Sequence, residues 1–254
     1  MKEKKLDIKG FQPLNGSSSY RPFTLNIALF GPEGAGKSRF IATCPGPIAG
    51  IILDMKSEIS IRRAQEEFQK EILLPPPDVT EDFIHDLDLR QIRKWINEAS
   101  GKDDKKAEAA KADFMEHYER RVSLVEDLLM EVCHHKDVKT VFVDSFYQYT
   151  MESKWAVQGP RQKMKKLSNN KVFQDNDSWY QRLIKLLNSI NVKHTILTHK
   201  WKDEYYNDVK TGRMTWEGFK YLGNHTICTI EFVINHKPKP TKDEFRYKLN
   251  VRNC

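Results

Sequence analysis

Short apolar runs alternate along the chain with longer segments in which apolar residues recur at helical spacing. The strand-length runs cover residues 24–30, 47–53, 138–143, 193–198, 226–234 and 245–252. Helical spacing is clearest over 57–69 and 80–135. Uninterrupted apolar runs are typical of strands covered on both faces, as in parallel sheets. The alternation predicts an α/β fold with a largely parallel central sheet flanked by helices, and antiparallel strands at the C-terminal end.

The chain is expected to form one domain behind a polar arm. Residues 1–22 are mostly polar and contain a Gly-Ser-Ser-Ser stretch, so we expect the domain to cover residues 23–254. Three consecutive prolines at 75–77 end any helix there. The helical stretch 80–135 that follows is interpreted as an insertion in this domain.

The most specific motif follows the first apolar run. Residues 31–38 read G-P-E-G-A-G-K-S and match G-x-x-x-x-G-K-[ST] between an expected strand and an expected helix. In such a loop, backbone N–H groups and the helix N-terminus bind phosphate. Lys37 is expected to reach the β- and γ-phosphates of ATP, and Ser38 to ligate Mg²⁺. The expected nucleotide-binding residues are Gly31, Pro32, Glu33, Gly34, Ala35, Gly36, Lys37, Ser38 and Arg39.

A second Mg²⁺ ligand is expected where another buried strand ends. The run Thr140–Val143 leads directly into Asp144, about a hundred residues after the phosphate loop. An aspartate at the end of a strand beside such a loop reaches Mg²⁺ directly or through a water molecule. The alternative is an aspartate that only caps a turn.

With these two motifs the chain resembles the RecA-like P-loop ATPases. More narrowly, it is similar to phage nucleotide-binding proteins related to RecA and RadA, some of which promote single-strand annealing. The resemblance covers residues 24–254 in element order and is specific at the two nucleotide motifs. It implies a RecA-like core and an ATPase that acts on single-stranded DNA in phage recombination or replication. It also implies a cytoplasmic location, inside a bacterial host cell if a phage encodes the protein.

The resemblance further implies roles for individual residues. The family has a catalytic Glu near the end of its second strand, where this chain has Lys56, so Glu58 is the candidate hydrolytic base and Asp54 the alternative. Both acids could instead only begin the next helix. His199, at the end of the fourth strand, is expected to sense the γ-phosphate. Arg252 is expected to act in trans on a neighbour's γ-phosphate in a homo-oligomeric ring or filament.

Positive charge is concentrated in one stretch, residues 159–171, in a chain with a formal net charge of +7. This stretch contains no acidic residue and five basic ones, Arg161, Lys163, Lys165, Lys166 and Lys171. Such a cluster favours binding to a nucleic-acid backbone, although a solvated linker would look the same. Trp201 and Trp216 lie on either side of an expected hairpin turn at 207–212, where they would stack on bases or pack the hairpin onto the sheet. We expect single-stranded DNA as the partner, with a single-strand-binding protein as a further candidate.

Other classes of function are excluded or left as alternatives. No apolar run approaches the roughly 18–20 residues of a membrane span, and the charged N-terminus is not a secretory signal. The four cysteines form no C-x-x-C pair and are expected to be reduced thiols, in agreement with a cytoplasmic location. Two alternatives stay open: a P-loop kinase for nucleotides or polynucleotide ends, with Arg161 in its lid, and a non-hydrolysing, nucleotide-gated DNA-binding protein.

Overall fold

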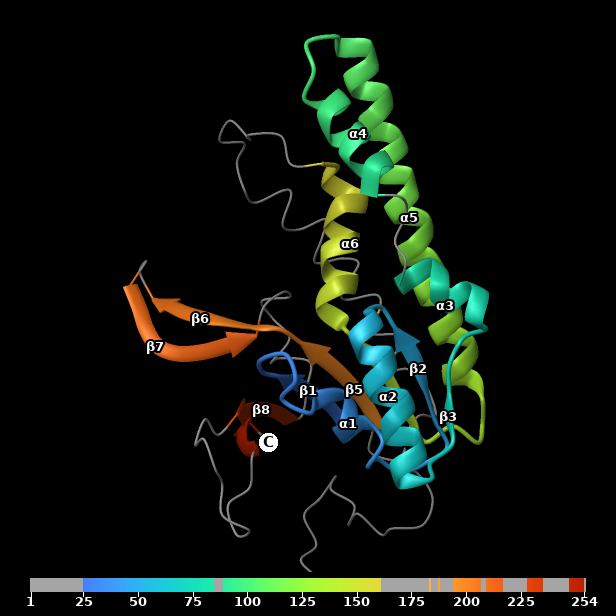
Figure 1. Ribbon diagram of the computed structural model, residues 1–254, viewed down its shortest axis with the longest axis vertical. Helices are drawn as coiled ribbons and strands as arrows, with labels where there is room; N and C mark the ends of the chain where they lie inside the picture. The colour runs from blue at the N-terminus through green and yellow to red at the C-terminus, as the bar shows by residue number, and fades with distance from the viewer. Residues whose placement is uncertain are drawn as a thin grey trace, which may run out of the picture.

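A sheet of seven strands forms the centre of the computed structural model (Figure 1). The structure describes residues 25–84, 89–160, 183, 187, 194–206, 209–216, 228–234 and 247–253. The strands follow the order β3-β2-β4-β5-β1-β8-β9. Their bounds are β1 (Leu25–Phe30), β2 (Ile48–Ile52), β3 (Ile72–Leu73), β4 (Thr140–Asp144), β5 (His194–His199), β8 (Cys228–Ile234) and β9 (Tyr247–Asn253). All neighbours are parallel except β8 and β9, which are antiparallel. The predicted fold class is therefore confirmed.

Helices cover both faces of this sheet. They are α1 (Lys37–Ile41), α2 (Met55–Phe68), α3 (Pro77–Ile84), α4 (Leu89–Ala99), α5 (Asp104–His134) and α6 (Phe146–Gln158). One apolar cluster packs α5 and α6 against the sheet through residues such as Leu129 and Phe146. A second cluster packs α1 and α2 against the sheet through residues such as Ile41 and Ile61. Every residue of β2 and β4 is buried, as the uninterrupted apolar runs predict.

The helices α3, α4 and α5 lie between β3 and β4 in the chain, over the range expected to be a helical insertion. The pair α4 and α5 extends beyond the sheet at the top of Figure 1. A separate cluster of mainly aromatic side chains holds this extension to α6. Its members are Phe114, Tyr118 and Ala156, with Ile92, Trp95 and Trp155 packed against them.

A two-stranded antiparallel hairpin follows β5 and projects away from the main sheet (Figure 1). Its strands are β6 (Trp201–Tyr206) and β7 (Val209–Trp216). The expected turn at 207–212 is too long, because β7 already begins at Val209 and pairs with Tyr206. The polar arm, residues 1–22, lies outside the described residues.

Two chemical expectations have different outcomes. No helix in the described ranges is long and apolar enough to cross a membrane. Cys44 and Cys133 are free and buried, whereas Cys228 is disulfide-bonded. The expectation of reduced thiols is therefore wrong for Cys228, because sequence spacing does not show which cysteines lie close together in the fold.

Candidate functional site

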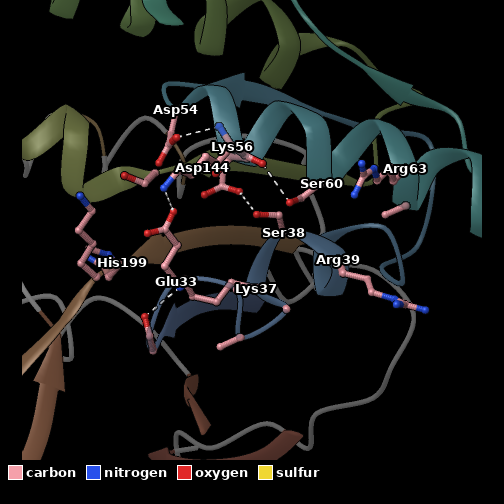
Figure 2. A pocket seen from close by; sticks show the side chains of 18 of the residues that line it. Glu33, Lys37, Ser38, Arg39, Asp54, Lys56, Ser60, Arg63, Asp144 and His199 are labelled. Carbon is pink, nitrogen blue, oxygen red and sulfur yellow. Dashed lines mark hydrogen bonds and ion pairs between the residues drawn. The ribbon is translucent and has the colours of Figure 1, made fainter. Parts of the chain in front are cut away.

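The carboxyl ends of β1, β4 and β5 meet at one edge of the sheet. In the registers of these strands, Phe30 pairs with His199 and Val143 pairs with Leu197. The glycine-rich loop after β1, Asp144 at the end of β4 and His199 therefore lie together, where open α/β sheets bind ligands. A cavity of about 770 Å³ opens at this edge, between the loop and α2 (Figure 2).

Glycines fix the path of the loop that forms one wall of the cavity. A Cβ atom at Gly31 would lie 2.5 Å from the carbonyl oxygen of Phe232 on β8, so a side chain there would collide with the neighbouring strand. Gly36 is the N-cap of α1 and has a φ of 95°, which is strained for residues with a side chain. These two positions explain why the motif needs glycine at its first and last glycine sites.

Lys37 lies within the loop rather than out in solvent. Its Nζ donates hydrogen bonds of 2.9 Å to the carbonyl oxygens of Gly31 and Pro32. Burial lowers the pKa of Lys37, while the nearby carboxylates of Asp144 and Glu33 act in the opposite direction. An ammonium group bonded to neutral carbonyls in a half-buried loop is placed to exchange them for the charged oxygens of a phosphate.

Asp144 is 2% exposed and is bonded by hydroxyl groups. Ser38 Oγ donates to its Oδ2 at 2.6 Å and Thr198 Oγ1 donates to its Oδ1, while the hydroxyl of Ser57 on α2 also favours the charged form. Burial raises the pKa of Asp144, although these hydrogen bonds and Lys37 act against the rise. A cation bound beside this carboxylate would favour its charged form further.

The donor set suits Mg²⁺ only together with a phosphate ligand. No group of three or more His, Cys, Asp or Glu side chains could hold a metal ion within the described part of the chain. Mg²⁺ is commonly held by one or two protein oxygens and by the phosphates of a nucleotide. Ser38 and Asp144, whose oxygens are 2.6 Å apart, are the residues that would hold it here.

The start of α2 forms the wall opposite the phosphate loop. The two candidate bases, Asp54 and Glu58, both lie there but differ in whether they line the cavity. Asp54 caps α2 by accepting a 2.9 Å hydrogen bond from the backbone N–H of Lys56, and both residues line the cavity. Glu58 does not line it. Its carboxylate instead forms an ion pair of 2.7 Å with Arg62, one turn further along α2. The geometry therefore favours Asp54 over Glu58 as the carboxylate nearest to a bound nucleotide.

His199 is fully buried at the end of β5 and lines the cavity. Its ring contacts that of Phe146 edge to face, with 5.1 Å between the ring centroids. Arg39 lies at the far end of the cavity, where it forms an ion pair with Glu67 and lies over the ring of Phe68. Both residues are thus placed beside the phosphate loop, at opposite ends of the cavity.

Sequence reasoning missed several residues of this site. Thr198 bonds Asp144 from β5, Ser57 on α2 lines the cavity and favours the charged form of Asp144, and Lys200 lines the cavity directly after His199. A hydroxyl residue gives no signal of its own in a sequence, because most serines and threonines lie on surfaces. Thr198 carried one indirect signal, since it immediately precedes the residue expected to sense phosphate.

The predicted nucleic-acid residues are only partly described. Arg161, Lys163, Lys165, Lys166 and Lys171 lie outside the described residues. Trp201 lines the cavity and pairs in register with Trp216 across the β6–β7 hairpin. Arg252 lies on β9, the antiparallel strand at the sheet edge beyond β8. The structure thus links one of the two tryptophans to the candidate site.

Comparisons with known proteins add little to this geometry. No protein-family model matches the chain, and no curated protein matches it. Among solved structures, the chain is similar to an ATPase from the type III secretion system of pathogenic bacteria, with 12% identity and a TM-score of 0.38. The match covers 84% of this chain but 52% of that chain, so this chain spans about half of its length. A likeness this distant says nothing about a substrate or partner.

Proposed function

We propose that the chain binds Mg²⁺ and ATP at the carboxyl edge of its sheet and hydrolyses the nucleotide. The observation that supports this best is the convergence of Lys37, Ser38 and Asp144, which come from one loop and a distant strand. Bound Mg²⁺ would neutralise charge that develops on the transferred phosphate. The loop N–H groups and Lys37 hold the phosphates, while Ser38 and Asp144 hold the metal.

Asp54 is proposed to orient the attacking water, because it is the carboxylate at the start of α2 that lines the cavity. His199 is proposed to detect the γ-phosphate from the end of β5. Asp54→Asn should then keep nucleotide affinity and lose turnover by about 10²–10⁴-fold, the usual contribution of a general base. Glu58→Gln is the matched control and should retain both. Normal turnover in Asp54→Asn with loss in Glu58→Gln would return the role to Glu58.

Single-stranded DNA is the proposed effector, on the strength of the basic stretch 159–171 and the tryptophan pair of the hairpin. Replacing Lys163, Lys165 and Lys166 with Gln should weaken the salt dependence of binding. The slope for single strands is about −0.7 per neutralised phosphate, so it should fall in magnitude by roughly two units. An unchanged slope would mean that this stretch is a solvated linker.

A second candidate is a nucleotide-gated DNA-binding protein that does not hydrolyse ATP. It is favoured by Lys56 where the family resemblance places a Glu, and by the position of Glu58 outside the cavity. Release of phosphate from ATP, measured with and without single-stranded DNA, separates the two candidates. The same assay with labelled γ-phosphate reports a kinase, since the label would then appear on an acceptor and not as free phosphate.

A further inference from the structure

An ion pair joins the two walls of the nucleotide cavity. Glu33 belongs to the phosphate loop and Lys56 to the first turn of α2, and Figure 2 shows the two side chains reaching toward one another. Lys56 Nζ lies 2.5 Å from Glu33 Oε1, and the side chains are 73% and 70% exposed. Because both residues line the cavity and are mostly exposed, their contact lies where the cavity meets solvent.

Glu33 is an anion in a loop whose other groups favour anions. The side-chain hydrogen bond and charge of Lys56 hold the pKa of Glu33 below its ordinary value, and Lys200 and Lys37 add to this effect. Glu33 therefore stays ionised and would repel a nucleotide if it faced the phosphates alone. The ion pair with Lys56 offsets this repulsion, but it also occupies a cation that a phosphate could use.

Lys56 lines the same cavity as Asp144, the residue proposed to hold the metal. The next residue, Ser57, favours the charged form of Asp144, and Asp54 on the other side caps the same helix. Lys37 belongs to the phosphate loop and Lys56 to α2, so the two lysines line the cavity from facing elements (Figure 2). A nucleotide bound by Lys37 and Asp144 would therefore place its terminal phosphate near the side of the cavity that Lys56 lines.

We propose that the Glu33–Lys56 ion pair is a latch that a third phosphate opens, and that Lys56 thereby distinguishes nucleoside triphosphates from diphosphates. This inference rests on the proposed nucleotide-binding function. An exposed ion pair is weak and readily exchanged. A terminal phosphate is the stronger partner for an ammonium group, because it offers more charge and more acceptor oxygens than one carboxylate. A diphosphate held by the loop lacks the group that competes with Glu33.

The test measures binding of a non-hydrolysable ATP analogue and of ADP, both with Mg²⁺, by titration calorimetry. Lys56→Gln should weaken analogue binding about tenfold more than ADP binding, the usual value of a hydrogen bond to a charged group, because ADP is affected only by the carboxylate of Glu33 that is left unpaired. Glu33→Gln frees Lys56 and should strengthen analogue binding by about twofold to fivefold. When Lys56→Gln is already present, adding Glu33→Gln should strengthen analogue and ADP binding to a similar degree, because only the repulsion by the unpaired carboxylate is then removed.

Lys106→Gln is the matched control. Lys106, in the first turn of α5, is 78% exposed and is paired with Asp103, the N-cap of that helix, so the variant loses the same charge from a surface ion pair that does not line the cavity. It should leave both affinities unchanged. Equal loss of analogue and ADP binding in Lys56→Gln, or weaker analogue binding in Glu33→Gln, would overturn the latch while leaving the nucleotide site intact. Failure of the parent protein to bind either nucleotide would instead overturn the proposed function itself, and the latch with it.

Discussion

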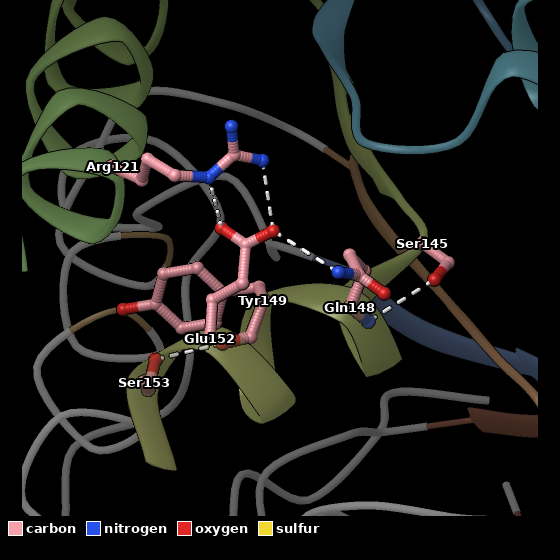
Figure 3. A network of polar contacts seen from close by, with 6 residues as sticks. All are labelled: Arg121, Ser145, Gln148, Tyr149, Glu152 and Ser153. Atoms are coloured by element: carbon pink, nitrogen blue, oxygen red, sulfur yellow. Dashed lines mark hydrogen bonds and ion pairs between the residues drawn. The ribbon is translucent and has the colours of Figure 1, made fainter. Parts of the chain in front are cut away.

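Two buried carboxylates, Glu152 and Asp144, differ in how neighbouring side chains compensate their negative charge. Glu152 on α6 is 1% exposed and accepts hydrogen bonds of 3.1 and 2.9 Å from the guanidinium group of Arg121 on α5 (Figure 3). Gln148 donates a further bond of 3.1 Å. Asp144 is buried to the same degree, but its side-chain donors are the hydroxyls of Ser38 and Thr198. The nearby cation, Lys37, donates to loop carbonyls instead.

The difference separates a charge that the fold itself compensates from one that, in the proposed function, a bound metal ion would compensate. Glu152 has its counter-ion in place, so it joins two helices without any further partner. Among the residues that the structure describes, no cationic group is in hydrogen-bond contact with Asp144, and burial raises its pKa. Incompletely compensated charges of this kind lower the stability of a protein and cluster at functional sites. The two regions should therefore respond in opposite directions when their charges are removed.

The largest effect on stability is expected for the ion pair between α5 and α6. Arg121→Met leaves the carboxylate of Glu152 buried without its cation, which should lower the free energy of unfolding by about 3–5 kcal/mol. Urea unfolding of both proteins measures this loss. Arg121→Met combined with Glu152→Leu should recover most of it, because the unpaired charge is then gone. If the single variant were as stable as the parent, the ion pair would make no net contribution.

The next effect is expected at the phosphate loop and concerns ligand binding. Lys37→Ala removes the half-buried ammonium group that bonds Gly31 and Pro32, so ATP affinity should fall by about a hundredfold, near 3 kcal/mol. Fluorescence titration with a labelled nucleotide measures the change, and circular dichroism checks the fold. Parental affinity in a folded variant would show that the loop binds no phosphate through this residue.

A smaller effect of opposite sign is expected for Asp144→Asn in the ligand-free protein. Asn keeps the shape and can still bond the surrounding hydroxyls, but it removes a buried charge, so stability at pH 7 should rise by about 1 kcal/mol. The raised pKa sets the pH dependence: the protonated acid stabilises the fold below its ordinary pKa of 3.8, and this contribution is lost as pH rises through the folded value. The advantage of the variant should therefore grow from pH 4 to pH 7. An advantage that shrinks over this range would contradict the assignment.

The sequence was sufficient to predict the features of the fold and site that are local or periodic. The phosphate loop is contiguous, and its glycines, Lys37 and Ser38 are adjacent in both sequence and space. Long apolar runs predicted the parallel strands, because burial on both faces leaves no alternation. Asp144 could be selected since a strand that ends beside such a loop delivers its last residue to the same sheet edge.

Features that depend on helix phase or on distant contacts could not be predicted in this way. The helix expected from residue 57 begins at Met55, and its cavity-lining residues follow a stripe that includes Ser57, Ser60 and Ala64 but not Glu58. A shift of two residues rotates a helix by more than half a turn. Arg121 and Glu152 are 31 residues apart on different helices, so nothing in the sequence distinguishes them from surface charges.

The most direct test of the central claim compares nucleotide binding with and without Mg²⁺ in the parent protein and in Asp144→Asn. If Asp144 is kept buried and incompletely compensated in order to hold the metal, Mg²⁺ should strengthen ATP binding by the parent. The variant should gain little from Mg²⁺, while its affinity without the metal should equal or exceed that of the parent. An equal gain from Mg²⁺ in both proteins would contradict the account and make Asp144 a structural residue like Glu152.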